Sequence, residues 1–198
     1  MTGPQVGQVP ESFRLPSGQG PDVSPDDYRG RRNLIVWFTK GMACAFCRQH
    51  MTQLRRGYPA FQELNAEILQ VTPTPLDRAH LYARKFDIPF PYLSDPEYRA
   101  RRAWGLDVRS HSIGWYAAAL VKGLRASVPP DDFGKVPTSL GELPTLLADE
   151  DMGFYVLDRS GVVRYSLAGS YTTSGGARQI PSNEEVMREL TLCERTAQ

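Results

Sequence analysis

The pattern of apolar and polar positions predicts buried strands alternating with helices along the first half of the chain. Residues 33–38 form an apolar run, rich in β-branched and aromatic side chains, that predicts a buried strand. Residues 48–56 predict a helix that ends at 57–59, where Gly and Pro occur. A second helical piece over 60–65 leads into residues 67–71, which predict the next strand. This order predicts two parallel strands joined by a helical crossover.

A further helix is predicted from Thr74 onwards. A hydroxyl at the cap position, Pro75 at the first helical position and Asp77 in the first turn together make a favourable helix start. The apolar positions of this helix stand at helical spacing and are expected to be buried: Leu76, Ala79, Ala83 and Phe86.

Asp95 and Pro96 open a short helix that is expected to end near Gly105. Its aromatic side chains, Tyr98 and Trp104, are expected to face the core. Its three arginines are expected to form a mostly solvated face: Arg99, Arg101 and Arg102.

The C-terminal part predicts a hairpin and a closing helix. Residues 153–157 and 162–167 predict two antiparallel strands joined by a glycine-bearing turn. Ser182 and Glu185 form a capping box for a last helix that runs to about Arg195. Taken together, the elements predict an α/β chain with a thioredoxin-like fold, in which helices flank a central mixed β-sheet.

Length and composition predict one domain. A chain of 198 residues can bury a sizeable core. Residues 1–9, rich in Gly, Pro and Gln, predict a flexible tail, and 10–198 a single thioredoxin-like domain. The prolines within 107–151 mark an insertion of that domain, in which 113–124 could form a helix. A net charge of +1 and the lack of a long apolar stretch argue against nucleic-acid and membrane partners, and favour a cytoplasmic protein.

Cys44 and Cys47 are the main chemical signal. They are two residues apart at the point where a buried strand turns into a helix, the layout of a thioredoxin-type redox site. Backbone N–H groups and the helix dipole at a helix start stabilise a thiolate, which is the nucleophile towards disulfides and peroxides. A metal site is not expected, because no second CxxC motif is present, and no cofactor is required. Cys193 shares helical spacing with apolar neighbours and is expected to be a core residue.

Residues next to the two cysteines are candidates for supporting roles. Thr39 and Lys40 are placed in the chain so that they could line the site. Arg48 lies in the first turn of the predicted helix, where it could lower a thiol pKa or hold a peroxide oxygen; a solvated helix arginine is the alternative.

Three segments carry a resemblance to a known family. They are residues 34–48, with the CxxC motif, residues 86–96, and residues 153–165. Through them the chain resembles the peroxiredoxin-like branch of the thioredoxin superfamily, labelled alkyl hydroperoxide reductase and thiol-specific antioxidant, over roughly 10–190. The resemblance implies an antioxidant oxidoreductase that contributes to cell redox homeostasis.

The sequence departs from the family pattern at the motif and opposite it. Ala43 and Ala45 replace the tryptophan and proline that usually flank the first cysteine. Met152 occupies the position where thioredoxins carry a cis-proline and peroxiredoxins an arginine that helps to bind peroxide. Typical peroxiredoxins have a threonine in place of Cys44 and attack with the cysteine aligned to Cys47, whereas thioredoxins attack with the first cysteine. The attacking sulfur is therefore left open.

We expect a thiol-dependent peroxidase that reduces hydroperoxides and cycles between a dithiol and a Cys44–Cys47 disulfide. A thioredoxin-like protein or a small thiol would be the reductant, and a homodimer is compatible with the resemblance. Two alternatives remain: a thiol–disulfide oxidoreductase acting on a disulfide substrate, and a non-catalytic redox switch whose partner surface lies in the 107–151 insertion.

Overall fold

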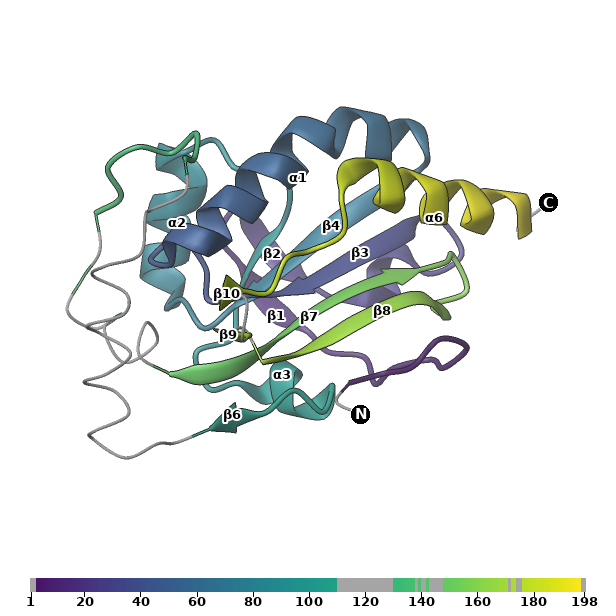
Figure 1. Ribbon diagram of the computed structural model, residues 1–198, viewed down its shortest axis with the longest axis horizontal. Coiled ribbons are helices and arrows are strands. Elements are labelled where there is room, and N and C mark those ends of the chain that lie inside the picture. Colours follow the sequence, from purple (N-terminus) through teal and green to yellow (C-terminus); the bar gives the residue numbers. More distant parts are fainter. Residues whose placement is uncertain are drawn as a thin grey trace.

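The computed structural model describes residues 3–109, 130–137, 139, 142, 148–170, 172–173 and 176–196. In these residues eight strands form one sheet, in the order β2-β1-β5-β4-β3-β7-β6 with β8 paired to the β7 strand, and a separate small pair is formed by β9 and β10 (Figure 1). The first elements are β1 (Leu15–Ser17), β2 (Gly20–Val23), the 3-10 helix η1 (Pro25–Tyr28), β3 (Asn33–Phe38), α1 (Ala45–Glu63), β4 (Ala66–Thr72), α2 (Leu76–Lys85) and β5 (Tyr92–Ser94). The later ones are α3 (Arg99–Ala103), β6 (Val108–Arg109), β7 (Asp149–Leu157), β8 (Val163–Ser170), β9 (Thr172–Thr173), β10 (Gly176–Ala177) and α6 (Asn183–Thr196).

The sheet is mixed, as the order of the predicted elements requires. β3 runs parallel to β4, and β4 runs parallel to β5. β7 is antiparallel to both β3 and β8, which confirms the predicted hairpin. β7 begins at Asp149 rather than at Gly153, so Met152 lies inside the strand and not before it. The predicted helix over 113–124, and most of the insertion, lie outside the described residues.

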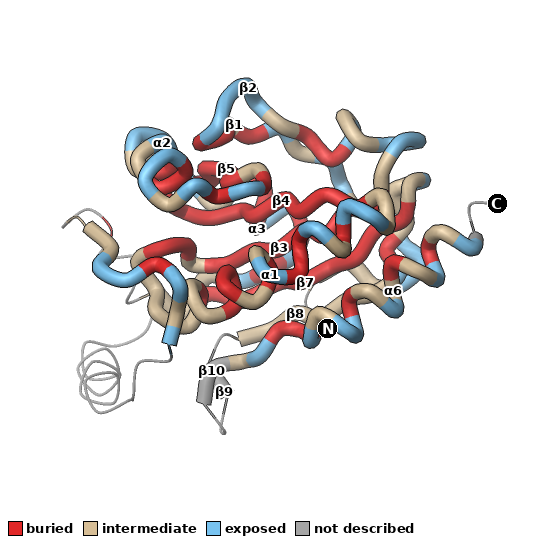
Figure 2. The backbone as a smooth tube through the Cα atoms, turned by 90° about the horizontal axis from the view of Figure 1, so that it is seen from above, coloured by how far each residue is buried: buried red, intermediate tan, exposed pale blue. Residues whose placement is uncertain are grey.

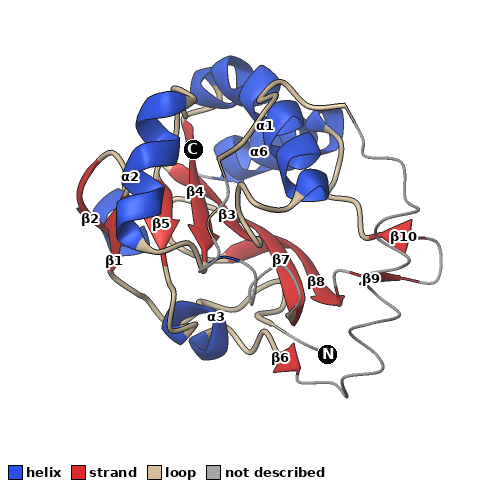
Figure 3. Cartoon of the chain, turned by 90° about the vertical axis from the view of Figure 1, so that its left-hand side faces the viewer, coloured by secondary structure: helices blue, strands red, loops and turns tan. Residues whose placement is uncertain are grey.

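Each face of the sheet packs against its own apolar cluster. Side chains of β3 alternate between the two, because successive residues of a strand point to opposite faces. Figure 2 shows β3 and β4 buried along their length, and Figure 3 shows α1, α2 and α6 on one side of the sheet and α3 on the other. Ile35 and Trp37 lie in the cluster that contains residues of α1, α2 and α6, whereas Val36 and Phe38 lie in the cluster that contains Trp104. All four of these β3 side chains are inaccessible to solvent. The buried run at 33–38 is thus explained by a strand covered on both sides.

Helix α1 is longer than the sequence predicts. It runs without a break through Pro59, although that residue was expected to end it. Leu54, Tyr58 and Phe61 remain buried on one side of the helix across the proline. The prediction was wrong because packing of this face outweighs the cost of about 3 kcal/mol for a proline inside a helix.

Two predictions about α2 also need correction. Thr74 does not cap the helix: Pro75 is the cap residue and no side chain caps the first turn. Leu76 is exposed, while Ala79 and Ala83 are buried as expected and Tyr82 joins them. The hydroxyl of Thr74 is instead drawn to a buried partner on the neighbouring strand, as described below.

The arginines of α3 are not equivalent. Arg101 is 2% exposed and forms an ion pair with Glu150, which is 0% exposed, at 2.9 Å. It also donates to the backbone oxygens of Thr39, at 3.0 Å, and Asp151. The prediction of a solvated face was wrong for Arg101, because the acid that draws it inwards lies far away in the sequence, on β7.

The C-terminal helix begins at a capping box, and the N-terminal residues pair with a strand. The last helix and its capping box, with Glu185 N–H donating to the Ser182 hydroxyl at 3.2 Å, are confirmed, and Cys193 is buried in the core as predicted. Residues 3–9, for which the composition predicts a flexible tail, lie beside β8. The Gly7 N–H donates to the Val163 carbonyl at 2.8 Å and the Val163 N–H to the Gln8 carbonyl at 2.9 Å. Backbone pairing to the start of β8 accounts for this placement without apolar side chains.

Candidate active site

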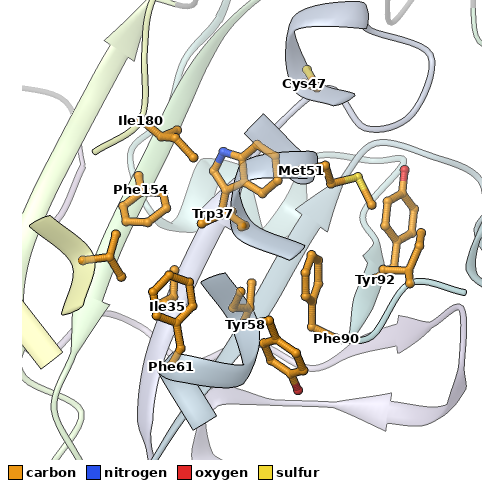
Figure 4. Close-up of a cluster of buried hydrophobic side chains, with 14 of the residues drawn as sticks. Ile35, Trp37, Cys47, Met51, Tyr58, Phe61, Phe90, Tyr92, Phe154 and Ile180 are labelled. Carbon is orange, nitrogen blue, oxygen red and sulfur yellow. The ribbon is translucent and has the colours of Figure 1, made fainter. Parts of the chain in front are cut away.

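The two cysteines lie at the start of α1, directly after the turn that follows β3. Cys44 is the N-cap residue of the helix, and Cys47 lies in its first turn. The backbone N–H of Cys47 donates to the Cys44 sulfur at a distance of 3.4 Å. The hydrogen bond that caps the helix therefore holds Cys47 close to the sulfur of Cys44. Figure 4 shows Cys47 at the helix start, at the upper end of the buried cluster that contains Trp37 and Met51. Both cysteines are free thiols.

The two cysteines differ in solvent exposure, and the pKa of the Cys44 thiol is shifted. Cys47 is 0% exposed, whereas Cys44 is partly exposed. The pKa of the Cys44 thiol is raised well above its usual value, first by a hydrogen bond to the side chain of Cys47, then by burial and by repulsion from a charge on Cys47. The Cys47 N–H and the charge of Lys40 act in the opposite direction. The two thiols therefore titrate as an interacting pair, and a charge on Cys47 makes Cys44 harder to ionise.

Lys40 and Thr39 lie between the end of β3 and the turn that carries the pair. Lys40 donates to the Ala148 carbonyl, just before β7, and its charge acts on Cys44. Thr39 is fully buried and continues the alternation of β3 that places Ile35 and Trp37 beneath α1. Within the described part of the chain its hydroxyl has no hydrogen-bond partner. A buried hydroxyl without a partner can bind a small polar molecule.

Arg48 holds a segment of the 107–151 insertion at the start of α1. Its Nε donates to Asp131 at 2.7 Å, and its guanidinium also donates to the Met42 carbonyl at 3.0 Å. Both side chains of the pair are mostly buried. Asp131 further accepts from the N–H groups of Phe133 and Gly134. Arg48 thus links the turn before Cys44, the first turn of α1 and residues 131–134, and its solvated alternative does not apply.

Met152 fills the place opposite the cysteines with an apolar side chain. It is completely buried in the same cluster as Cys47, beside Met42 and Met51. No charge is therefore supplied from this position of β7, and the thioether offers only a weak acceptor. Among the described residues no group of three or more His, Cys, Asp or Glu side chains could hold a metal ion, and no helix is long and apolar enough to cross a membrane.

Sequence reasoning missed three side chains that shape the site: Arg101, Asp131 and Tyr92. Each acts through a contact distant in sequence, which neither periodicity nor spacing reveals. Asp131 stands in a proline-broken stretch with no element pattern, and Tyr92 belongs to a short strand whose aromatic residue has the pattern of an ordinary core position. The resemblance pointed to the segment of Tyr92, 86–96, but to no role for it.

Comparisons by sequence agree with this geometry. The sequence model of the AhpC/TSA family matches residues 6–166. The chain is 24% identical to a chloroplastic peroxiredoxin Q of Triticum aestivum over 159 residues, which are 80% of this chain and 57% of the wheat protein. It is 26% identical to a putative peroxiredoxin of Mycobacterium tuberculosis (strain H37Rv) over 130 residues, which are 66% of this chain and 80% of that protein. The match thus spans less than two thirds of the wheat relative.

Comparisons of structure place the fold in the same group. The reduced 2-Cys peroxiredoxin of Plasmodium vivax superimposes with a TM-score of 0.63 at 16% identity, covering 97% of this chain and 98% of that one. The peroxidoxin BcpB of Mycobacterium tuberculosis gives 0.61 at 13% identity, with 96% of both chains covered. Thioredoxin peroxidase I of Plasmodium yoelii gives 0.60 at 14% identity, covering 98% of this chain and 91% of that one. At these identities the likeness shows the fold.

Proposed function

The chain belongs to the AhpC/TSA family, in the peroxiredoxin-like branch of the thioredoxin superfamily, and on that premise we propose that it is a thiol peroxidase that works through Cys44 and Cys47. The observation that carries this proposal is the cap of α1, where the Cys47 N–H donates to the Cys44 sulfur and the two thiols share a hydrogen bond. Two sulfurs held in this way can form a disulfide without any other part of the chain moving far.

The reaction balances over two steps and a regeneration. A thiolate attacks one oxygen of the hydroperoxide, the O–O bond breaks, and the released alkoxide or hydroxide takes up a proton, leaving a sulfenic acid on the sulfur. The thiol of the other cysteine then attacks the sulfenic sulfur, and water leaves as the Cys44–Cys47 disulfide forms. Exchange with an external dithiol returns both cysteines to thiols. The peroxide gains the two electrons that the reductant loses.

We assign the attack on peroxide to Cys47. The raised pKa of Cys44 makes that thiol the less readily ionised nucleophile, and the peroxiredoxin pattern aligns its attacking cysteine with Cys47. Complete burial of Cys47 restricts access to small peroxides. Cys44 then resolves the sulfenic acid. The unpartnered hydroxyl of Thr39 and the charge of Lys40 are the groups best placed to hold the peroxide, since Met152 supplies none.

The partly exposed sulfur of Cys44 is the site at which the reductant would act. A reductant thiolate that attacks Cys44 forms a mixed disulfide with it and expels Cys47 as the leaving thiolate. The structural neighbour from Plasmodium yoelii is a thioredoxin peroxidase, and we extend a thioredoxin-like or small-thiol reductant to this chain. A homodimer and a cytoplasmic location, in which the disulfide would be reduced again, stay predictions.

The test is a reaction of the fully reduced protein with one equivalent of hydrogen peroxide at neutral pH. Free thiols and intact mass are followed over seconds. The proposal expects two thiols to be lost together, with a mass decrease of two hydrogens, and Cys193→Ser to behave as the wild type. Cys44→Ser should stop at a sulfenic acid on Cys47, and Cys47→Ser should not react faster than a free thiol. Loss of thiols no faster than that of a free cysteine would overturn the proposal.

A thiol–disulfide oxidoreductase is the second candidate, favoured by the partial exposure of Cys44 at the helix cap. In this reaction Cys44 attacks a partner's disulfide, and Cys47 releases the mixed disulfide. The same variants separate the two functions. A protein that survives peroxide but exchanges rapidly with a disulfide substrate, and loses this exchange in Cys44→Ser, is an oxidoreductase.

A further inference from the structure

Tyr92, at the start of β5, lies completely buried beneath the turn that carries the two cysteines. The backbone N–H of Met42 donates to its phenol oxygen at 3.2 Å. The hydroxyl of Thr74 lies 2.9 Å from the same oxygen. Figure 4 shows the phenol oxygen directed to the same end of the cluster as Met51 and Cys47. A buried hydroxyl with two polar partners is a fixed point on which a turn can be held.

The turn is fitted closely to this pair of hydroxyls. Gly41 has a φ of +80°, and a Cβ atom at this residue would lie 2.5 Å from the Tyr92 oxygen and 2.7 Å from the Thr74 oxygen. Only glycine meets both conditions, because it tolerates a positive φ and has no side chain. Thr74 in turn leaves the start of α2 uncapped while its hydroxyl faces Tyr92. The contact between Tyr92 and Thr74 thus leaves α2 without a side-chain cap and restricts position 41 to glycine.

The phenol also lies within the electrostatic reach of the sulfur pair. Burial raises the pKa of Tyr92 to about 12; hydrogen bonds from Thr74, Thr72 and Met42 act against this, and the charge of Cys47 adds to it. Tyr92 is therefore neutral at neutral pH and keeps its proton. Its oxygen is thus an uncharged, hydrogen-bonded anchor for the Met42 N–H.

We propose that Tyr92 is a positioning residue for the CxxC pair, which holds the Gly41–Met42 turn in place through its phenol oxygen. Through the turn it fixes Cys44 at the helix cap, where the Cys47 N–H donates to the Cys44 sulfur, and this bond favours ionisation of the pair. This role rests on the proposed peroxidase function only in its effect on the peroxide reaction.

The test compares Tyr92→Phe with a matched control, Tyr155→Phe. Tyr155 is also completely buried, but in the cluster on the other face of the sheet, and its hydroxyl has no hydrogen-bond partner within the described residues. Thiolate absorbance of the reduced proteins is titrated over the pH range below tyrosine ionisation. The other ionisable groups on the elements around the pair stay unchanged in both variants: Lys40 on the turn, Arg48 and His50 on α1, Asp131 within the insertion, and Glu150 on β7.

In Tyr92→Phe the turn loses its anchor, the cap hydrogen bond to the Cys44 sulfur loosens, and the midpoint of thiolate formation should rise by about one pH unit, the size expected for a hydrogen bond to a charged group. The peroxide rate at neutral pH should fall about tenfold, following the lost thiolate. Tyr155→Phe should leave both unchanged. Thr74→Ser, which keeps the hydroxyl, should retain the wild-type midpoint, whereas Thr74→Val should raise it.

An unchanged midpoint in folded Tyr92→Phe would overturn the inference, as would an equal shift in Tyr155→Phe. Should Tyr92→Phe fail to fold, an unshifted midpoint in Thr74→Val overturns it instead. A wild-type protein that does not react with peroxide, combined with a shifted midpoint in Tyr92→Phe, would refute the peroxidase and leave the role of Tyr92 standing.

Discussion

Replacing Arg101 with methionine should destabilise the protein far more than the same change at its neighbour Arg102. Arg101 is 2% exposed, and its guanidinium binds the Glu150 carboxylate and the carbonyl oxygens of Thr39 and Asp151. Methionine fills a similar volume but makes none of these three contacts. Arg102 is exposed, so its replacement serves as the matched control for composition and helix propensity.

The size of the destabilisation depends on the Glu150 carboxylate, which stays buried when Arg101 is removed. Removal of one member of a buried ion pair costs about 3–5 kcal/mol, because the other charge stays buried without compensation. Here Glu150 can take up a proton: its pKa is already raised by burial, so the loss should lie near 3 kcal/mol. For a chain of this size, each kcal/mol lowers the melting temperature by about 2–4 °C, which predicts a decrease of about 6–12 °C.

Thermal and urea unfolding of the two variants, measured by circular dichroism at neutral pH, give the comparison. Arg101→Met should lose about 3 kcal/mol and Arg102→Met less than about 0.5 kcal/mol. A double variant that also carries Glu150→Leu should recover part of the loss, since a buried pair replaced by apolar groups is often tolerated. Equal stabilities of Arg101→Met and Arg102→Met would refute the buried ion pair and the burial of α3 described here.

Three further predictions concern the surroundings of the two sulfurs. Burial raises the pKa of Asp131, but hydrogen bonds, above all from Arg48, outweigh it and lower the pKa below 3.8, so this carboxylate stabilises the fold above that pH. Asp131→Asn should therefore lose about 2 kcal/mol at pH 7 by urea unfolding, and its difference from the wild type should shrink as the pH falls below about 4. Gly41→Ala should cost more than about 1 kcal/mol in thermal unfolding and slow the peroxide reaction, because its Cβ would collide with the Tyr92 oxygen; an unaffected protein would contradict the fit of the turn. Cys193→Ser should leave peroxide kinetics unchanged but lower stability by about 1–3 kcal/mol, since a hydroxyl replaces a buried thiol, and slower kinetics would give Cys193 a redox role.

The fold could be predicted where local signals and burial agree. The run at 33–38 is apolar on both faces because both faces of β3 are covered. The hairpin formed by β7 and β8 could be recognised because a glycine-bearing turn separates its two apolar runs. Pro59 misled the prediction because a proline signals a helix end locally, while the apolar face that carries α1 through it extends over several turns. The predicted cap at Thr74 was wrong for a similar reason, because its hydroxyl hydrogen-bonds to Tyr92 on a neighbouring strand instead of to the start of α2.

The candidate site could be predicted as far as its spacing. Two cysteines at a strand-to-helix junction are visible in the sequence, and the structure brings Cys44 and Cys47 together at one helix cap. The supporting side chains could not be found in this way. Arg101 had the pattern of a solvent-exposed arginine because its acid partner, Glu150, is 49 positions away. The alternatives for Arg48 stayed open because its partner, Asp131, lies within the insertion, 83 positions away. Long-range ion pairs leave no periodic trace in a sequence.

The central claim is that Cys47 attacks the peroxide and Cys44 resolves the product. The most direct measurement treats reduced Cys44→Ser and Cys47→Ser with one equivalent of hydrogen peroxide in the presence of a sulfenic-acid trap, followed by intact mass and peptide mapping. The account predicts rapid trapping on Cys47 in Cys44→Ser, and in Cys47→Ser no trapping on Cys44 beyond the rate of a free thiol. Rapid trapping on Cys44, with none on Cys47, would contradict the assignment of the attacking sulfur, and no trapping in either variant would contradict the peroxidase itself.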